Sequence, residues 1–283
     1  MSTSPSIFKT ADDAKVILPI VAIEAFLKET IYCDYTHPHI QNEIKKHADK
    51  SKNERELAVS LFYFVRDHVR YRVGNMNRKA SGTYLEKGGA CTDKANLLIA
   101  LCRAVGIPAG YGVMEVFGPK FFGVITPPSL AAKISKTTKH VYAHIYLSKR
   151  WIKCDPSDDL PLSISTRHLN QQSRTVEWGG VSDAVLNLNP IHILNDKGPL
   201  HNIDHIISKK QRKALYIPVR IANLYIQFLR QHGSQIKSVE ALEPAFLRWL
   251  RKMHRTWYVL YVVFLKERSH QGKALAEVDD VEI

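Results

Sequence analysis

The segment from Cys91 to Val105 constrains the fold more than any other part of the chain, because it has the composition of a helix that is apolar on nearly every side. Gly88 and Gly89 interrupt the chain before it, and Gly106 ends it. A helix without a polar face must be enclosed by other elements. The sequence therefore predicts that this helix lies at the centre of a domain, with Cys91 at its N-terminus.

A second helix is expected just upstream of this segment. Ser51 and Glu54 have the spacing of a capping box, and apolar residues at positions 57, 61, 65 and 69 then repeat at helical spacing. The pattern ends near Tyr71, and residues 74–82 have the composition of a loop.

Strands follow the central helix. Residues 111–117, 140–147 and 151–155 have strand patterns, and residues 148–150 form a short turn between the last two. Residues 118–138 are irregular and contain three prolines. A loop of that length is often a lid or a substrate-binding segment.

Positive charge is concentrated towards the C-terminus. The net charge is +13, and residues 206–255 contain eleven Lys or Arg against two Glu. Helices are expected at 210–231, with an interruption at Pro218, and at 238–253 and 255–268. We expect a catalytic-type domain over residues 1–200, with its core at about 54–160, and a basic helical extension over 201–283. Such a field attracts anions: nucleic acid, an anionic membrane, a CoA-type phosphate or an acidic protein.

The four cysteines show no metal-binding spacing, since none belongs to a CxxC pair. Four cysteines in 283 residues do not make a disulfide scaffold either. No metal and no cofactor is expected. The first 15 residues lack the apolar run of a secretory signal, and the late apolar run at 257–265 is shorter than the roughly 20 residues that a membrane span needs. The expectation is a cytoplasmic protein with no transmembrane segment.

Cys91 is the candidate nucleophile. The N-terminus of a helix carries partial positive charge and free N–H groups, which favour a thiolate and could stabilise an oxyanion. Gly89 would let a substrate approach the backbone closely. The alternative is that Cys91 is only a small buried apolar residue, as most cysteines are. We expect Cys102 and Cys154 to be such core residues.

The strand at 140–147 supplies a candidate base. Because side chains alternate across a strand, His140, Tyr142 and His144 share one face, where Tyr142 and His144 would line a cleft. If the two residues after Leu147 form the loop of a hairpin, Asp155 lies diagonal to His140 and within reach of it. A carboxylate there could orient the imidazole as in a catalytic triad. Surface histidines and a turn-forming aspartate remain the alternative.

These segments, taken together, resemble the transglutaminase-like superfamily. Residues 89–95 (Gly-Ala-Cys-Thr-Asp-Lys-Ala) and 101–108 (Leu-Cys-Arg-Ala-Val-Gly-Ile-Pro) are similar to its cysteine segment. Residues 140–147 and 151–156 (Trp-Ile-Lys-Cys-Asp-Pro) are similar to its histidine and aspartate segments. The resemblance covers about residues 54–159. It implies a papain-like α+β core with N-terminal helices, in which Cys91, His140 and Asp155 are catalytic. His144 stands where many members have Glu.

The resemblance implies cysteine-dependent acyl transfer through an acyl-cysteine, from a thioester or amide donor to an amine or an internal nucleophile. An acidic carrier protein or a CoA thioester would suit the basic extension. A cysteine peptidase or amidase of the same fold is the first alternative. The second is a non-enzymatic protein whose basic helices, with Trp249 and Trp257 among arginines, bind an anionic membrane or nucleic acid, although such residues more often dock a helix on its own core.

Overall fold

In the computed structural model, residues 23–74, 77–122, 125–131, 134–169, 175–186, 189–209 and 216–263 are described. The expectations for residues 1–15, for 210–215 and for 264–268 lie outside these residues. The central element is helix α5 (Cys91–Ala104), in which every residue from Cys91 to Arg103 is buried. The prediction of an enclosed central helix is thus confirmed.

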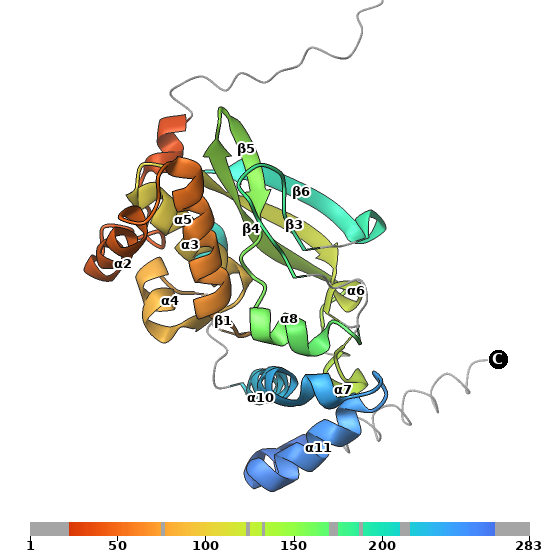
Figure 1. Ribbon diagram of the computed structural model, residues 1–283. Helices are drawn as coiled ribbons and strands as arrows, with labels where there is room; N and C mark the ends of the chain where they lie inside the picture. Colours follow the sequence, from red (N-terminus) through yellow and green to blue (C-terminus); the bar gives the residue numbers. More distant parts are fainter. Residues whose placement is uncertain are drawn as a thin grey trace, which may run out of the picture.

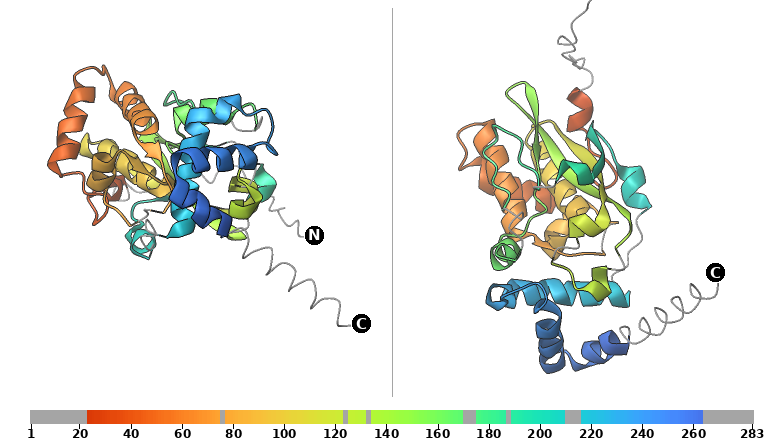
Figure 2. Two further views of the ribbon diagram at one scale, coloured as in Figure 1. Left: turned by 90° about the horizontal axis from the view of Figure 1, so that it is seen from below. Right: turned by 90° about the vertical axis from the view of Figure 1, so that its right-hand side faces the viewer.

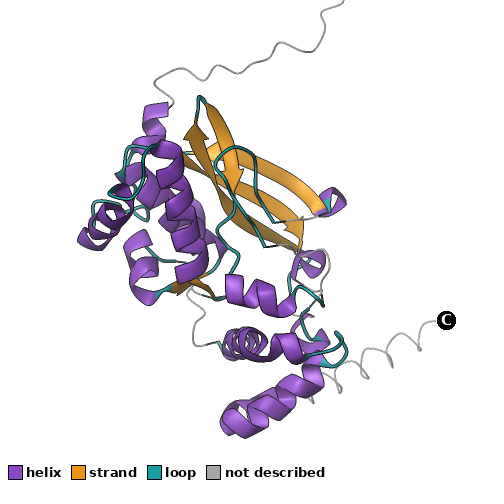
Figure 3. Ribbon diagram, viewed as in Figure 1, coloured by secondary structure: helices purple, strands orange, loops and turns teal. Residues whose placement is uncertain are grey.

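Helices enclose α5 on one side and an antiparallel sheet encloses it on the other (Figures 1 and 3). The helices are α2 (Pro38–Ala48), α3 (Glu54–His68) and α4 (Ala80–Glu86), preceded by the short η1 (Ala25–Leu27). The sheet has the order β5 (Arg150–Cys154), β4 (Thr137–Leu147), β3 (Ala109–Phe117) and β6 (Ile193–Leu200). This is a mixed α+β architecture, as the sequence predicts.

A loop of two residues connects β4 and β5. Leu147 pairs with Arg150, and the two residues between them, Ser148 and Lys149, have positive φ angles of 50° and 62°. Two successive residues in the left-handed region match the twist of the flanking strands. The ladder places Ala143 opposite Cys154, so the next residue, Asp155, follows on the face opposite that of Cys154.

The start of α3 differs from the prediction. The N-cap is Asn53, whose side-chain oxygen accepts from the N–H of Glu56, whereas the Ser51 hydroxyl donates to the carbonyl of His47. Asparagine is among the strongest N-cap residues, and Glu56 also accepts from the Lys52 N–H. The capping motif therefore lies two residues later than the Ser51–Glu54 pair.

Two short strands lie where the sequence shows no strand pattern. After α3 ends at His68, β1 (Arg70–Tyr71) pairs in parallel with β2 (Gly88–Gly89), immediately before α5. The expected extension of the helix to Tyr71 is therefore wrong. The last residues of the predicted loop at 74–82 belong to α4. Strand β6 comes from residues 193–200, for which the sequence predicts no strand.

The predicted loop at 118–138 contains two short helices, α6 (Gly118–Phe122) and α7 (Pro128–Ala131), and its last two residues already belong to β4. Leu130 packs in a cluster with residues of the C-terminal helices, and the Tyr225 hydroxyl donates to the carbonyl of Ile125 at 2.6 Å. Residues 125–131 are thus in contact with the C-terminal helices.

Four of the remaining elements form a layer beneath the lower end of the sheet in Figure 1, which Figure 2 shows from two further sides. They are α8 (Leu160–Thr166), α10 (Ile217–His232), η3 (Gly233–Gln235) and α11 (Leu242–Met253). By contrast, η2 (Pro190–His192) directly precedes β6, and α9 (Asp204–Ser208) contributes Ile207 to the cluster around α5. Residues 255–263 are also helical. Pro218 lies in the first turn of α10, so it starts this helix instead of kinking it.

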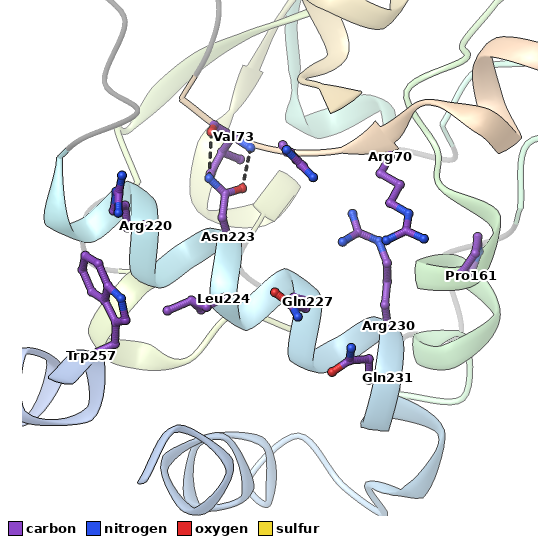
Figure 4. A pocket seen from close by; sticks show the side chains of 11 residues that line it. Arg70, Val73, Pro161, Arg220, Asn223, Leu224, Gln227, Arg230, Gln231 and Trp257 are labelled. Atoms are coloured by element: carbon purple, nitrogen blue, oxygen red, sulfur yellow. Dashed lines mark hydrogen bonds between the residues drawn. The ribbon is translucent and has the colours of Figure 1, made fainter. Parts of the chain in front are cut away.

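Polar contacts join α10 to the rest of the chain. The Asn223 side chain accepts from the N–H of Val73 and donates to its carbonyl, both at 3.0 Å, as an adjacent strand would (Figure 4). Arg230 binds Asp159 and the carbonyl of Tyr71. The apolar side chains of α10 and α11 form a cluster of their own, separate from the one around α5.

Candidate active site

Cys91 is the first residue of α5, directly after the β1–β2 ladder. Asp93 accepts from the N–H of Ala90 at 2.9 Å, which fixes the turn that leads into the helix. A Cβ at Gly89 would lie 2.5 Å from the Cβ of Asp93, so only glycine fits beside this cap. The chain thus sets the Cys91 sulfur at a helix N-terminus, where the macrodipole favours negative charge.

His140 and Asp155 are in direct contact. The Nε2 atom of His140 lies 2.6 Å from Oδ2 of Asp155, and both side chains are buried. The other oxygen of Asp155 accepts from the N–H and the hydroxyl of Ser157, at 3.0 and 2.5 Å. The carboxylate is therefore fixed from both sides and holds the imidazole in one orientation.

The ionisation of this pair follows from its contacts. Burial alone would lower the pKa of His140. The charge of Asp155 and its hydrogen bond to the ring outweigh this effect, and Cys91 adds to the rise, so the pKa reaches about 10. Burial opposes ionisation of Asp155, yet His140 and Ser157 hold its pKa below the ordinary value. Both shifts favour an imidazolium–carboxylate pair.

Cys91 is the second side chain that acts on the imidazole, and it raises the pKa of His140. The other ring nitrogen of His140, Nδ1, is buried and makes no hydrogen bond within the described residues. The structure therefore brings together the three residues Cys91, His140 and Asp155, in that order of contact. This arrangement can move a proton between a thiol and an imidazole.

The three candidate substrate-binding residues lie in different surroundings. Gly89 is buried in the β1–β2 ladder next to Cys91. Tyr142 is fully buried and donates to Asp196 at 2.6 Å, with its ring 6.4 Å from that of His140. His144 is also buried, and neither of its ring nitrogens has a hydrogen-bond partner within the described residues.

The environment of His144 favours its neutral form. Burial, and then the charge of Lys153, lower its pKa to about 4. Its ring lies 5.2 Å from that of Tyr142, and its Nε2 atom is 2.8 Å from where a Cβ at Gly198 would be. The side chain is thus a neutral, enclosed ring. A role for Tyr142 and His144 in binding substrate stays a prediction.

Two further residues belong to this region, and sequence reasoning did not select either. Burial raises the pKa of Tyr71, as do the charges of Cys91 and Asp155, which places its ring close to both. Lys94 is fully buried and donates to the carbonyls of Arg66 and Asp158, at 3.1 and 2.6 Å. Lys94 thereby ties the helix that carries Cys91 to the turn after Asp155.

Access to Cys91 is restricted. The residue is 7% exposed, and Phe121 of α6 lies with its ring 5.0 Å from that of His140. A groove of about 720 Å³ lies elsewhere, between β1 and α10. Phe121 therefore lies beside the candidate base, and a role of residues 118–138 as a lid or substrate-binding segment stays a prediction.

The other three cysteines are free thiols in the core, as expected for Cys102 and Cys154. Burial raises the pKa of Cys33 to about 11, and it raises those of Cys102 and Cys154 as well. Within the described part of the chain, no group of three or more His, Cys, Asp or Glu side chains could hold a metal ion. Nor is any helix among those residues long and apolar enough to cross a membrane.

Comparison with known proteins gives a family for the middle of the chain. Residues 38–156 match the family model of the transglutaminase-like superfamily. No curated protein matches the chain. A solved structure described as a "Putative Cysteine Protease from Cytophaga hutchinsonii" is similar at 26% identity over 51% of this chain, with a TM-score of 0.39. The match spans 46% of that protein, less than half of its length. Residues 38–156 thus form a transglutaminase-like domain.

Proposed function

We propose that the chain is a cysteine-dependent acyl-transfer enzyme in which Cys91 is the nucleophile, His140 the base and Asp155 the residue that orients His140. The observation that carries the proposal is the contact chain from the helix N-terminus through the imidazole to a buried carboxylate. A nucleophile, a base and an orienting group are what covalent acyl transfer requires.

The chemistry follows from these contacts. In the resting site His140 already holds the proton that the Cys91 thiol has given up, so the reactive form is a thiolate–imidazolium pair, and the thiolate sulfur attacks the carbonyl carbon of the acyl donor. Backbone N–H groups at the start of α5 stabilise the resulting oxyanion. The tetrahedral intermediate collapses, the leaving thiol or amine takes the proton from His140, and an acyl-cysteine remains. An amine or another nucleophile then attacks the acyl carbon, gives its proton to His140, and releases Cys91.

The acyl donor is a thioester or an amide. The basic C-terminal helices support a donor with negative charge, such as a CoA thioester or an acyl group on an acidic carrier protein. We also propose that residues 1–200 form the catalytic domain and that residues 201–283 form an extension packed on it. The four free thiols support a reducing compartment such as the cytoplasm. If water replaces the amine, the same site is a hydrolase.

Intact-protein mass spectrometry tests the proposal. Wild type, Cys91→Ala and Cys33→Ala proteins are mixed with simple acyl thioesters and, separately, with a glutamine-containing peptide, without added amine. Cys33→Ala is the matched control, because it removes a buried thiol that the mechanism does not use. We expect a gain of one acyl mass in wild type and in Cys33→Ala, and none in Cys91→Ala.

A second step separates transfer from hydrolysis. The acylated protein is divided between buffer and buffer with a primary amine, and the products are identified. An amide product indicates transfer, and a free acid in both samples indicates hydrolysis. The proposed nucleophile is contradicted if Cys91→Ala is acylated at the wild-type rate. It is also contradicted if neither donor acylates the wild-type protein.

A further inference from the structure

A groove of about 720 Å³ lies between β1 and α10 and is separate from the candidate active site (Figure 4). Its volume is in the range of small-molecule sites, which is roughly 300–1,000 Å³. The polar and aromatic groups that matter for its chemistry are Arg70, Arg72, Arg220, Gln227, Arg230 and Trp257.

The secondary structure explains why these side chains meet. Side chains alternate along the extended chain of β1 and the residue after it, so Arg70 and Arg72 share a face and line the groove, whereas Tyr71 does not. Along α10 the lining residues are at positions 220, 223, 224, 227, 230 and 231, which is one face of a helix. The two elements therefore present a basic wall each, and Figure 4 shows Arg70 and Arg230 pointing towards each other across the groove.

The positive charge of the groove is poorly compensated. Among the described residues that line it there is no carboxylate. Arg230 has one acidic partner, Asp159, at 2.9 Å. The guanidinium groups of Arg70 and Arg72 make no ion pair within the described residues, and both side chains are exposed. Burial lowers the pKa of Arg230 and Asp159 raises it, but the charges of Arg70 and Arg72 lower it again, so the three cations lie close together.

One end of the groove also offers an aromatic surface. The guanidinium of Arg220 lies over the ring of Trp257, 5.5 Å from its centroid, and Trp257 is partly exposed. An indole beside a cation provides a face on which a planar heterocycle can stack. The uncharged amide of Gln227 lies between the two ends and can donate to and accept from a ligand.

We infer that this groove binds a nucleotide that carries at least two phosphates, with the phosphates held by Arg70, Arg72 and Arg230 and the base stacked beside Trp257. Arginine forks match phosphate oxygens in pairs, and Arg70 and Arg72 make no ion pair within the described residues that would compete with a phosphate. The bounded volume suits a small ligand better than an extended strand. This inference does not depend on the proposed catalysis, since the groove is formed without Cys91, His140 or Asp155.

Binding is measured by isothermal titration with the full chain carrying Cys91→Ala, so that no turnover contributes. The probes are ADP, inorganic pyrophosphate, adenosine and a short single-stranded DNA. We expect ADP to bind, pyrophosphate to bind more weakly, adenosine not to bind, and the affinity for ADP to fall steeply with salt. A DNA strand that binds more tightly than ADP would overturn the inference.

Two sets of variants locate the site. Arg70→Gln with Arg72→Gln is expected to weaken ADP at least about tenfold, since two charged contacts are lost. Trp257→Leu is expected to weaken ADP and to leave pyrophosphate unchanged. Arg248→Gln with Arg251→Gln removes the same charge from an exposed surface of α11 and serves as the control. Equal weakening in the control, or no binding of ADP by the parent chain, refutes the nucleotide site.

Discussion

Replacing Asp155 by Asn removes one charge from the centre of the candidate active site and changes little else. The side chain keeps its size and retains an oxygen that can accept from Ser157. What disappears is the negative charge that raises the pKa of His140. Without that charge, burial dominates and the imidazole is neutral at neutral pH.

The size of the effect follows from the same contacts. The pKa of His140 rises from 6.5 to about 10, an interval worth about 5 kcal/mol at about 1.4 kcal/mol per pH unit. This value of about 5 kcal/mol is an upper limit for the loss of stability in Asp155→Asn, because the imidazole of the variant can lose its proton and is then no longer a buried charge without a partner. We expect Asp155→Asn to lower the free energy of unfolding by about 2–3 kcal/mol at pH 6, the value of a hydrogen bond to a charged group.

The dependence on pH has a definite sign. A histidine whose folded pKa is raised contributes its full stability below the unfolded pKa of 6.5 and loses it as pH rises through about 10. The difference between wild type and Asp155→Asn should therefore be largest at pH 6 and smallest at pH 10.

Urea unfolding at several pH values measures this difference. Asp196→Asn is the matched control, because Asp196 is partly exposed and pairs with Tyr142 and Lys153 instead of with His140. It should cost about 1 kcal/mol or less. A difference between wild type and Asp155→Asn that stays constant from pH 6 to pH 10 would refute the reasoning.

Three further variants test other contacts. His140→Ala should raise the pKa of the Cys91 thiol, because the imidazolium beside the thiolate is lost, and an unchanged alkylation rate at every pH would contradict this pairing. Gly89→Ala should displace Asp93, which lies 2.5 Å from the new Cβ, and slow the acylation of Cys91; acylation at the wild-type rate would show that the turn adapts. Leu98→Ala, in the buried middle of α5, should lower the free energy of unfolding by about 2–5 kcal/mol in chemical denaturation, whereas a loss below 1 kcal/mol would mean that the core closes around the gap.

The sequence predicts those parts of the fold that have a strong local pattern. The helix that begins at Cys91 is apolar on nearly every side and has glycines at its boundaries, and both its position and its burial follow from that. The hairpin that brings Asp155 to His140 follows from alternation and from a two-residue loop. In each case the signal lies within about fifteen residues.

The other parts depend on contacts between distant segments. A strand as short as β1 has no periodicity, and its position is set by Gly88 and Gly89. Two charged residues in the first turn of α5 show the same dependence. Asp93 is a cap, whereas Lys94 is in the core, because its ammonium meets the carbonyls of Arg66 and Asp158 from two other segments.

The distribution of the four thiols has a consequence for oxidative chemistry. Cys91 and Cys102 are eleven residues apart on one helix, or about 16 Å along its axis, well beyond the reach of a disulfide. Cys33 and Cys154 influence the pKa of Cys102 or are influenced by it, so all three core thiols group around the far part of the helix. A sulfenic acid formed on Cys91 by peroxide therefore lacks a resolving thiol in the same chain. Its repair would depend on an external thiol, and without one the oxidation would proceed to the irreversible sulfinic state.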